Sequence, residues 1–301
     1  MKKAAILFCV LALTTWSALS QESDSPELTG PYLGQKPPGT VPEVFAPGIV
    51  SSEAHEFSSC FSPNGKEFYF SRRHPDLNET VVMVSTLFEG VWTEPVVAPF
   101  VKKQFSFEPW VTPDNKKLYF QSGVPIPGQT GPPMNVLYVE REGDGWGEAT
   151  NPGPPFNPAQ AMHISSTADG TIYTTDISGG MGSECLGIIR KVDGKYLKLE
   201  KLGPPLDKLK QSMHPYIAPD ESYIIFGSRQ PGQQFTNVLY FSYRKADGGW
   251  SEPKEINLGI NAGLPFVTGD GKYLFFTSGE QGKSDIYWVS IRILDKLKPK
   301  K

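Results

Sequence analysis

A five-residue turn motif that recurs five times constrains the fold of this chain more than any other feature of its sequence. The first copy is Phe61-Ser-Pro-Asn-Gly65, and each copy precedes a strand-like run such as EFYFS, KLYFQ or YLFFT. The fourth motif residue returns at intervals of 50 to 55 residues, at Asn64, Asp114, Asp169, Asp220 and Asp270. Such a period indicates five copies of one structural unit.

The composition of the motif suits a tight hairpin turn. Proline presets the backbone angle of an early turn residue, Asp or Asn hydrogen-bonds to its own backbone, and glycine accepts a positive φ. A second landmark keeps the same register, because an aromatic residue follows each of the first four markers by 27 to 32 residues, at Trp92, Trp146, Tyr196 and Trp250. Since they recur at one position of the repeat, we interpret them as packing residues rather than as sugar-stacking residues.

Each unit contains four predicted strands, which in the fourth unit are residues 214–218, 223–228, 237–244 and 250–257. Second strands such as FYF, LYF and LFF are continuous apolar runs, which indicates sheets that are buried on both faces. A radial stack of four-stranded blades buries each sheet between two neighbours, whereas a linear β-solenoid would repeat with a shorter period. The predicted fold is therefore an all-β, five-bladed propeller of antiparallel blades.

The last unit lacks a fourth strand of its own. It ends with the predicted strand at residues 285–293, whereas Pro42-Glu-Val-Phe-Ala-Pro47 resembles Glu94-Pro-Val-Val-Ala-Pro99 of the first unit. An N-terminal strand that completes the last blade would close the ring and remove its free sheet edges. We therefore assign residues 41–295 to the propeller, residues 21–40 to a flexible leader rich in Pro, Gly and Ser, and residues 296–301 to a basic tail.

The first 20 residues match a cleaved signal peptide. Lys2 and Lys3 precede an apolar run over residues 4–13, and Ala18-Leu19-Ser20 supplies small residues at the positions that a signal peptidase reads. The run is too short to span a bilayer, and no later segment is long and apolar enough. The prediction is an exported protein, periplasmic or secreted, without a membrane span after cleavage.

Neither the net charge nor the cysteine content suggests a nucleic-acid-binding protein or a disulfide-stabilised one. A net charge of −3 gives no indication of nucleic-acid binding. Outside the signal segment only Cys60 and Cys185 remain, and they fall in different repeats. We expect two reduced thiols rather than a disulfide framework.

The turn motif followed by an aromatic strand resembles the PD40 (WD40-like, TolB-like) propeller repeat of bacterial exported proteins. The resemblance covers residues 42–293. Single copies depart from the family pattern, because Asn64 replaces Asp, Ala168 and Gly269 replace Pro, and Glu221 replaces Gly. TolB carries an additional N-terminal domain that this sequence lacks, so the resemblance implies a fold and an exported location rather than an activity.

One position of the repeat gathers chemically active residues. In a propeller, the start of the inner strand lies at the same end of the ring as the loop between strands two and three. The residues there, six before each marker, are Ser58, Glu108, His163, His214 and Leu264. Glu108, His163 and His214 belong to consecutive blades. Two interpretations stay open: a metal or acid/base cluster, or histidines that share repeat ancestry and bond to neighbouring backbone.

Charged residues at the ends of the second strands share this end of the ring. They are Arg72, Asp176 and Arg229. Arginines at these positions would bind a carboxylate or sugar acid, or would pair between blades. The loops that follow, including residues 125–133 and 178–184, differ strongly from blade to blade. Dissimilar loops on a rigid scaffold are typical of recognition sites.

Two functions from different classes follow from these observations. The first is a monomeric binding or scaffold propeller, without a required cofactor, that holds a protein segment or an envelope glycan at the loop-bearing face. The second is a lyase or hydrolase that acts on an acidic saccharide. In that alternative, which rests on a resemblance to oligogalacturonate lyases, Glu108, His163 and His214 would hold a divalent metal, and Arg72 and Arg229 would bind substrate. We prefer the binding propeller, since the lyase rings are larger.

Overall fold

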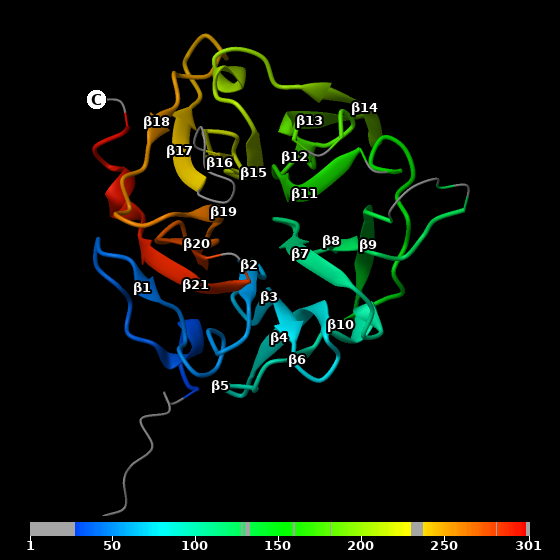
Figure 1. The fold of residues 1–301 in the computed structure, drawn as a ribbon, viewed down its shortest axis with the longest axis vertical. Helices are drawn as coiled ribbons and strands as arrows, with labels where there is room; N and C mark the ends of the chain where they lie inside the picture. Colours follow the sequence, from blue (N-terminus) through cyan, green and yellow to red (C-terminus); the bar gives the residue numbers. More distant parts are fainter. Residues whose placement is uncertain are drawn as a thin grey trace, which may run out of the picture.

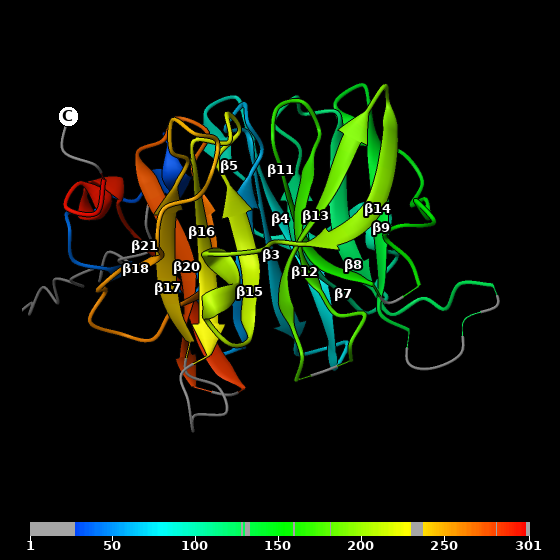
Figure 2. The ribbon, with the colours of Figure 1, turned by 90° about the horizontal axis from the view of Figure 1, so that it is seen from above.

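The computed structural model describes residues 28–127, 129, 133–158, 160–180, 182–229, 237–280 and 282–298. It is an all-β ring of five antiparallel sheets around a common axis (Figure 1), and we call the region along this axis, where side chains of different blades meet, the channel. Each sheet is one blade, and the strands run between the two ends of the ring (Figure 2). The predicted five-bladed propeller is therefore confirmed. The expected signal peptide lies outside the described residues.

Four blades follow the order of the sequence from the channel outward. Blade one contains β2 (Glu56–Phe61), β3 (Glu67–His74), β4 (Glu79–Phe88) and a divided outer strand, β5 (Val91–Trp92) and β6 (Val96–Val97). Blade two contains β7 (Ser106–Val111), β8 (Lys117–Ser122), β9 (Asn135–Glu142) and β10 (Gly145–Trp146). Blade three contains β11 (Ala161–Ser166), β12 (Ile172–Asp176), β13 (Cys185–Val192) and β14 (Lys195–Lys201). Blade four contains β15 (Ser212–Ile217), β16 (Tyr223–Arg229), β17 (Asn237–Tyr243) and β18 (Lys254–Glu255).

The fifth blade joins the two ends of the chain, as predicted. Its inner three strands are β19 (Gly263–Val267), β20 (Tyr273–Glu280) and β21 (Lys283–Ser290), and its fourth is the N-terminal β1 (Glu43–Val44). β1 pairs antiparallel with β21, with Glu43 opposite Trp288 and Val44 opposite Tyr287. Figure 1 shows this closure where the blue strand β1 lies beside the red strand β21.

Short 3₁₀ helices lie outside the blades, at Tyr32–Gly34, Pro99–Val101, Leu206–Lys208 and Ile291–Leu294. In the described ranges, no helix has the length and apolar character needed to cross a membrane.

Part of the segment assigned to a leader, around residues 30–33, packs against the propeller. Leu33 is fully buried, and the Tyr32 ring contacts Trp288 while its hydroxyl donates to Asp270 at 2.9 Å. The indole N–H of Trp92 donates to the carbonyl oxygen of Gly30 at 2.7 Å. A composition rich in Pro and Gly suggested flexibility, but two apolar side chains, Tyr32 and Leu33, anchor the segment to blades one and five.

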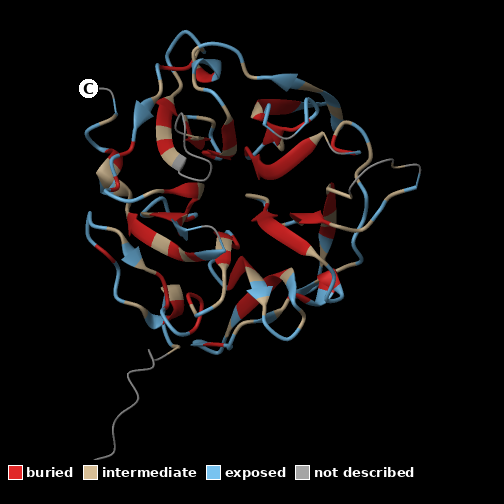
Figure 3. Cartoon of the chain, in the orientation of Figure 1, coloured by how far each residue is buried: buried red, intermediate tan, exposed pale blue. Residues whose placement is uncertain are grey.

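The recurring aromatic residues of blades two and three bond to the blade before them, which supports their interpretation as packing residues. The Trp146 indole donates to the Tyr69 hydroxyl at 2.7 Å, and the Tyr196 and Tyr119 hydroxyls lie 3.1 Å apart. In each pair the tyrosine belongs to the second strand of the preceding blade. Buried residues accordingly follow the inner and middle strands, and exposed ones lie on outer strands and loops (Figure 3).

Cys60 and Cys185 are free thiols, as expected from their different repeats. Cys60 is buried in β2 of blade one, and burial raises the pKa of its thiol to about 12. Cys185 begins β13 of blade three.

Candidate functional site

The five residues of the repeat position singled out above share one unusual backbone conformation. Ser58, Glu108, His163, His214 and Leu264 all have φ between 47° and 57°. Each lies where the pairing register of the inner strand shifts, so each is a β-bulge. A left-handed non-glycine residue costs roughly 1–2 kcal/mol, and here the surrounding ladder imposes it in every blade. We call this set the bulge ring.

The blades hold the bulges in place with hydroxyl groups from neighbouring second strands. The backbone N–H of Glu108 donates to Ser71 Oγ at 2.9 Å, and that of His214 donates to Thr175 Oγ1 at 2.8 Å. The N–H of Ser58 donates to Thr277 Oγ1 at 3.0 Å. These bonds satisfy donors that the interrupted ladder leaves free.

The bulge ring brings the three predicted site residues into contact. His214 Nε2 lies 3.5 Å from Glu108 Oε1, and His163 Nδ1 lies 3.9 Å from Glu108 Oε2. The two imidazole rings meet edge to face, with centroids 5.3 Å apart. Glu108 comes from blade two and His214 from blade four, so these side chains meet across the channel. All three are largely buried rather than placed on an open rim.

Burial makes the cluster electrically neutral near pH 7. It raises the pKa of the Glu108 carboxyl to about 8, with a small opposing effect from the backbone N–H of His163. It also lowers the pKa of the His214 imidazole to about 4, helped by the nearby Arg229 cation, and lowers that of His163 well below its ordinary value. The contacts therefore join a protonated acid and two neutral imidazoles rather than an ion pair.

We expect Glu108→Gln to remove a pH dependence of stability. In the unfolded chain the carboxyl ionises near its ordinary pKa of 4.5, whereas in the folded protein it keeps its proton to about pH 8. Unfolding thus releases a proton between these values, and this carboxyl's contribution to the free energy of unfolding is lost as the pH rises through that window. The variant should gain about 2–4 kcal/mol relative to wild type between pH 5 and pH 8. Urea titrations at both pH values measure this, and a constant difference would contradict it.

Several buried polar atoms at this end have no hydrogen-bond partner among the described residues. They include Glu108 Oε2, the Nδ1 atoms of His163 and His214, and Arg229 Nε. Both amide atoms of Gln121, which is only 1% exposed, are also unpaired. Leaving such groups without a partner is costly, so the cluster is prepared for hydrogen bonds that the described chain does not supply.

Sequence analysis did not identify Gln121, although its position in the repeat distinguishes it. It occupies in β8 the position that Ser71, Thr175 and Thr277 occupy in their own second strands, and β8 packs beside β11, which carries His163. The three hydroxyls accept backbone N–H groups of the bulge ring, but the longer amide does not. Blade four has Gly227 at this position, so a comparison of the repeats would have marked Gln121 as the one long polar side chain among the five.

Two of the predicted site residues have internal partners instead. Arg72 donates to Glu56 at 2.8 Å and to the carbonyl oxygens of Ile49 and Val50, which ties the N-terminal segment to blade one. Asp176 accepts bonds from the N–H and hydroxyl of Ser178 at the start of the following loop. The structure therefore brings together Glu108, His163, His214 and Arg229, and assigns Arg72 and Asp176 to the scaffold.

A divalent metal is the cofactor that the sequence pattern suggested for Glu108, His163 and His214. Carboxylate and imidazole are suitable ligands for a transition metal. The three side chains contact one another directly, however, and across the described residues no group of three or more His, Cys, Asp or Glu side chains is arranged to hold a metal ion. The side-chain arrangement gives the metal assignment no support.

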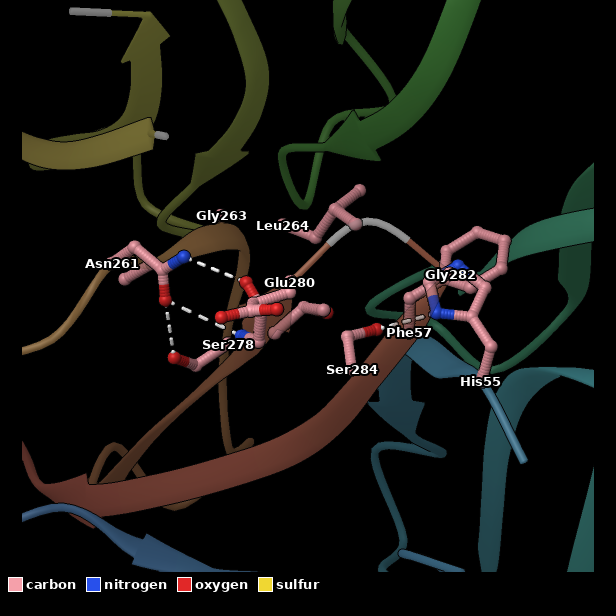
Figure 4. Close-up of a pocket in the computed structure, with 12 residues that line it drawn as sticks. His55, Phe57, Asn261, Gly263, Leu264, Ser278, Glu280, Gly282 and Ser284 are labelled. Atoms are coloured by element: carbon pink, nitrogen blue, oxygen red, sulfur yellow. Dashed lines mark hydrogen bonds between the residues drawn. The ribbon is translucent and has the colours of Figure 1, made fainter. Parts of the chain in front are cut away.

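A cavity of about 250 Å³ opens at the part of the bulge ring that belongs to blades five and one (Figure 4). His55, Phe57, Leu264 and Glu280 are among its lining residues. Before the bulge, blades one to four have Phe57, Phe107, Met162 and Met213, whereas blade five has Gly263. The missing side chain leaves this space. His55 Nδ1 lies 2.9 Å from Ser284 Oγ, and burial lowers the pKa of its imidazole.

Comparison with solved structures found similar folds at low sequence identity. It is similar to TolB from Acinetobacter baumannii, with 13% identity and a TM-score of 0.51 over 81% of this chain and 53% of that one. It is also similar to a structure described as a glycoside hydrolase, with 11% identity and a TM-score of 0.52 over 88% and 93% of the two chains. The chain spans about half the length of the TolB structure.

No protein-family model matches the chain, and no curated protein matches it in sequence. The likenesses to solved structures, all at low identity, show the fold alone. A TolB-like propeller is therefore established as the architecture of this chain.

Proposed function

We propose that this chain is an exported binding propeller that holds a protein segment or an envelope glycan at the loop-bearing end of its channel. The observation that supports it is the group of unpaired buried polar atoms on Glu108, Gln121, His163, His214 and Arg229. A ligand with its own donors and acceptors would satisfy these groups and recover the cost of their burial. Export is supported by the charged start and apolar run of the first 20 residues.

The charge distribution of the cluster favours a polar ligand with an acidic group. Glu108 and the two histidines are neutral near pH 7, which leaves Arg229 as the cation beside His214. A guanidinium binds a carboxylate more strongly than a neutral group. The cavity beside Leu264 lies at the same end of the ring and provides space for an apolar part of a ligand.

A second function, cleavage of an acidic saccharide, is favoured by one observation. A carboxyl with a pKa raised to about 8 next to two neutral imidazoles combines a proton donor with potential proton acceptors. In this alternative Glu108 would protonate a leaving oxygen, and a histidine would accept a proton.

One experiment separates the two functions. The purified protein is tested against oligogalacturonate, oligosaccharides of the bacterial envelope and a display library of linear peptides, with zinc and manganese supplied or chelated. We expect retention of a probe without turnover, and a loss of at least tenfold in affinity for both Glu108→Gln and Arg229→Gln. Arg190→Gln, at an exposed arginine on β13, is the matched control and should bind as wild type.

Two results would count against the binding propeller. Turnover of oligogalacturonate that Glu108→Gln abolishes would establish the catalytic alternative. A ligand whose affinity is the same in wild type, Glu108→Gln and Arg229→Gln would place the binding site elsewhere on the ring.

A further inference from the structure

A second cavity lies at the opposite end of the channel, where the five turn motifs gather. Its volume is about 490 Å³, which is within the range of small-molecule sites. The third residue of every turn lines it, namely Pro63, Pro113, Ala168, Pro219 and Gly269. In two of the five turns the expected proline is replaced by a smaller residue. We call this cavity the turn-end cup.

Aromatic side chains form the wall of the cup toward the channel. Trp110, Tyr216 and Phe266 follow the bulge ring by two residues, and their ring centroids lie 6.0 to 6.2 Å apart. They come from blades two, four and five, so they meet across the axis. This repeat position thus places a layer of aromatic side chains from three blades between the polar cluster and the cup. Phe61 and Tyr223 extend the aromatic lining.

The polar groups of these aromatic residues are already paired within the protein. The Trp110 indole donates to Ser166 Oγ at 3.1 Å, and the Tyr216 and Tyr223 hydroxyls bond to each other. The cup therefore offers its ligand the rings rather than free donors. Asp220 is the one charged side chain among the described residues that line it, and no lysine or arginine does.

Aromatic rings together with a single carboxylate favour a positively charged ligand. The face of an aromatic ring carries negative potential and attracts a cation, and a carboxylate at the rim adds to that attraction. We propose that the turn-end cup binds an organic amine cation that carries an apolar body, such as an aromatic ring. This site is separate from the polar cluster and does not depend on the function proposed for it.

The proposal is tested with three probes of similar size and different charge. Isothermal titration calorimetry is carried out on the purified protein with 2-phenylethylammonium, 2-phenylethanol and 3-phenylpropionate. We expect the amine to bind at least tenfold more tightly than the carboxylate, with the alcohol between them. Equal affinity for the amine and the alcohol would overturn the proposal, and so would tighter binding of the carboxylate.

Paired variants locate the site. Asp220→Asn keeps the oxygen that accepts from Ser222 but removes the charge, so it should weaken amine binding threefold or more. Asp114→Asn makes the same change in a turn whose aspartate does not line the cup and should have no effect. Unchanged amine binding in Asp220→Asn, or equal loss in both variants, would contradict the assignment.

A third variant blocks the cup. The Gly269 backbone is not left-handed, and a Cβ there would meet Pro63 O at an ordinary 3.4 Å, so Gly269→Leu should fold normally while filling the space. An unchanged thermal unfolding midpoint verifies the fold. We expect amine binding to fall below detection in this variant and to be unaffected by Glu108→Gln. Retained binding in Gly269→Leu would place the amine elsewhere.

Discussion

Replacing Phe45 with alanine should lower the free energy of unfolding by about 3–5 kcal/mol, a large effect for one substitution. Phe45 follows the closing strand β1 and is fully buried. Its ring contacts those of Phe61, Phe68, Phe275 and Trp288, with centroid distances of 4.9 to 6.2 Å. The side chain thus joins blades one and five where the ring closes, and its loss leaves a cavity that the flanking sheets cannot fill.

Urea unfolding followed by tryptophan fluorescence measures this difference. Val41→Ala, at a side chain that is 72% exposed in the same segment, serves as the matched control and should change stability by less than about 0.5 kcal/mol. A loss below 1 kcal/mol for Phe45→Ala would mean that the N-terminal strand contributes little to closure of the ring.

Glu67→Ala should destabilise the protein by about 3 kcal/mol, because it removes the carboxylate that balances the charge of a partly buried arginine. Arg141 of blade two donates to both carboxylate oxygens of Glu67 in blade one, at 2.9 and 2.6 Å. The Tyr69 hydroxyl also donates to Glu67, and the Arg141 guanidinium lies 3.6 Å from the Trp146 ring centroid. The substitution therefore removes both side-chain partners' bonds to Glu67, and through them affects Trp146, at the contact between two blades.

A double replacement tests this network. Combining Glu67→Leu with Arg141→Met removes both charges and should recover most of the loss, since neither partner is left unpaired. Glu140→Ala, which breaks the exposed Lys117–Glu140 pair nearby, is the control and should cost less than about 1 kcal/mol. If Glu67→Ala proved as mild as Glu140→Ala, the ion pair between blades one and two would contribute no more than a surface pair.

The sequence predicted those features that depend on repetition. Five turns, matched aromatic landmarks and a missing last strand were enough to predict five blades and their closure by residues near Val44. The same register placed Glu108, His163 and His214 at one end of the channel. Contacts with segments outside the repeat were not predictable. Arg72 is an example, because it bonds to the carbonyl oxygens of Ile49 and Val50 in a segment that does not repeat.

Two further features of the structure, the N-terminal segment and the outer strands, differ from what composition suggests. Pro and Gly in residues 21–40 suggested a leader without fixed structure, whereas the contacts of Tyr32 with Trp288 and the burial of Leu33 depend on two side chains that composition does not single out. The outer strands were expected to be long, for example over residues 250–257, but β18 covers only Lys254–Glu255, with one bridge between Arg244 and Trp250. Side-chain contacts of the outer aromatic residues, rather than a long ladder, hold that part of the blade.

The backbone of the bulge ring is indifferent to the residue it carries. Leu264, with no polar group, has a φ of 53°, and Glu108, with a buried acid, has a φ of 54°. Blade geometry, rather than local chemistry, thus imposes the left-handed conformation at all five positions. Each of the five positions therefore accepts different side chains with the same backbone conformation. The residue that faces the channel can be substituted without a change in the strands of its blade. Ser58 and Leu264 are the two bulge-ring residues without an ionisable side chain, so they are suitable positions for introducing a new functional group.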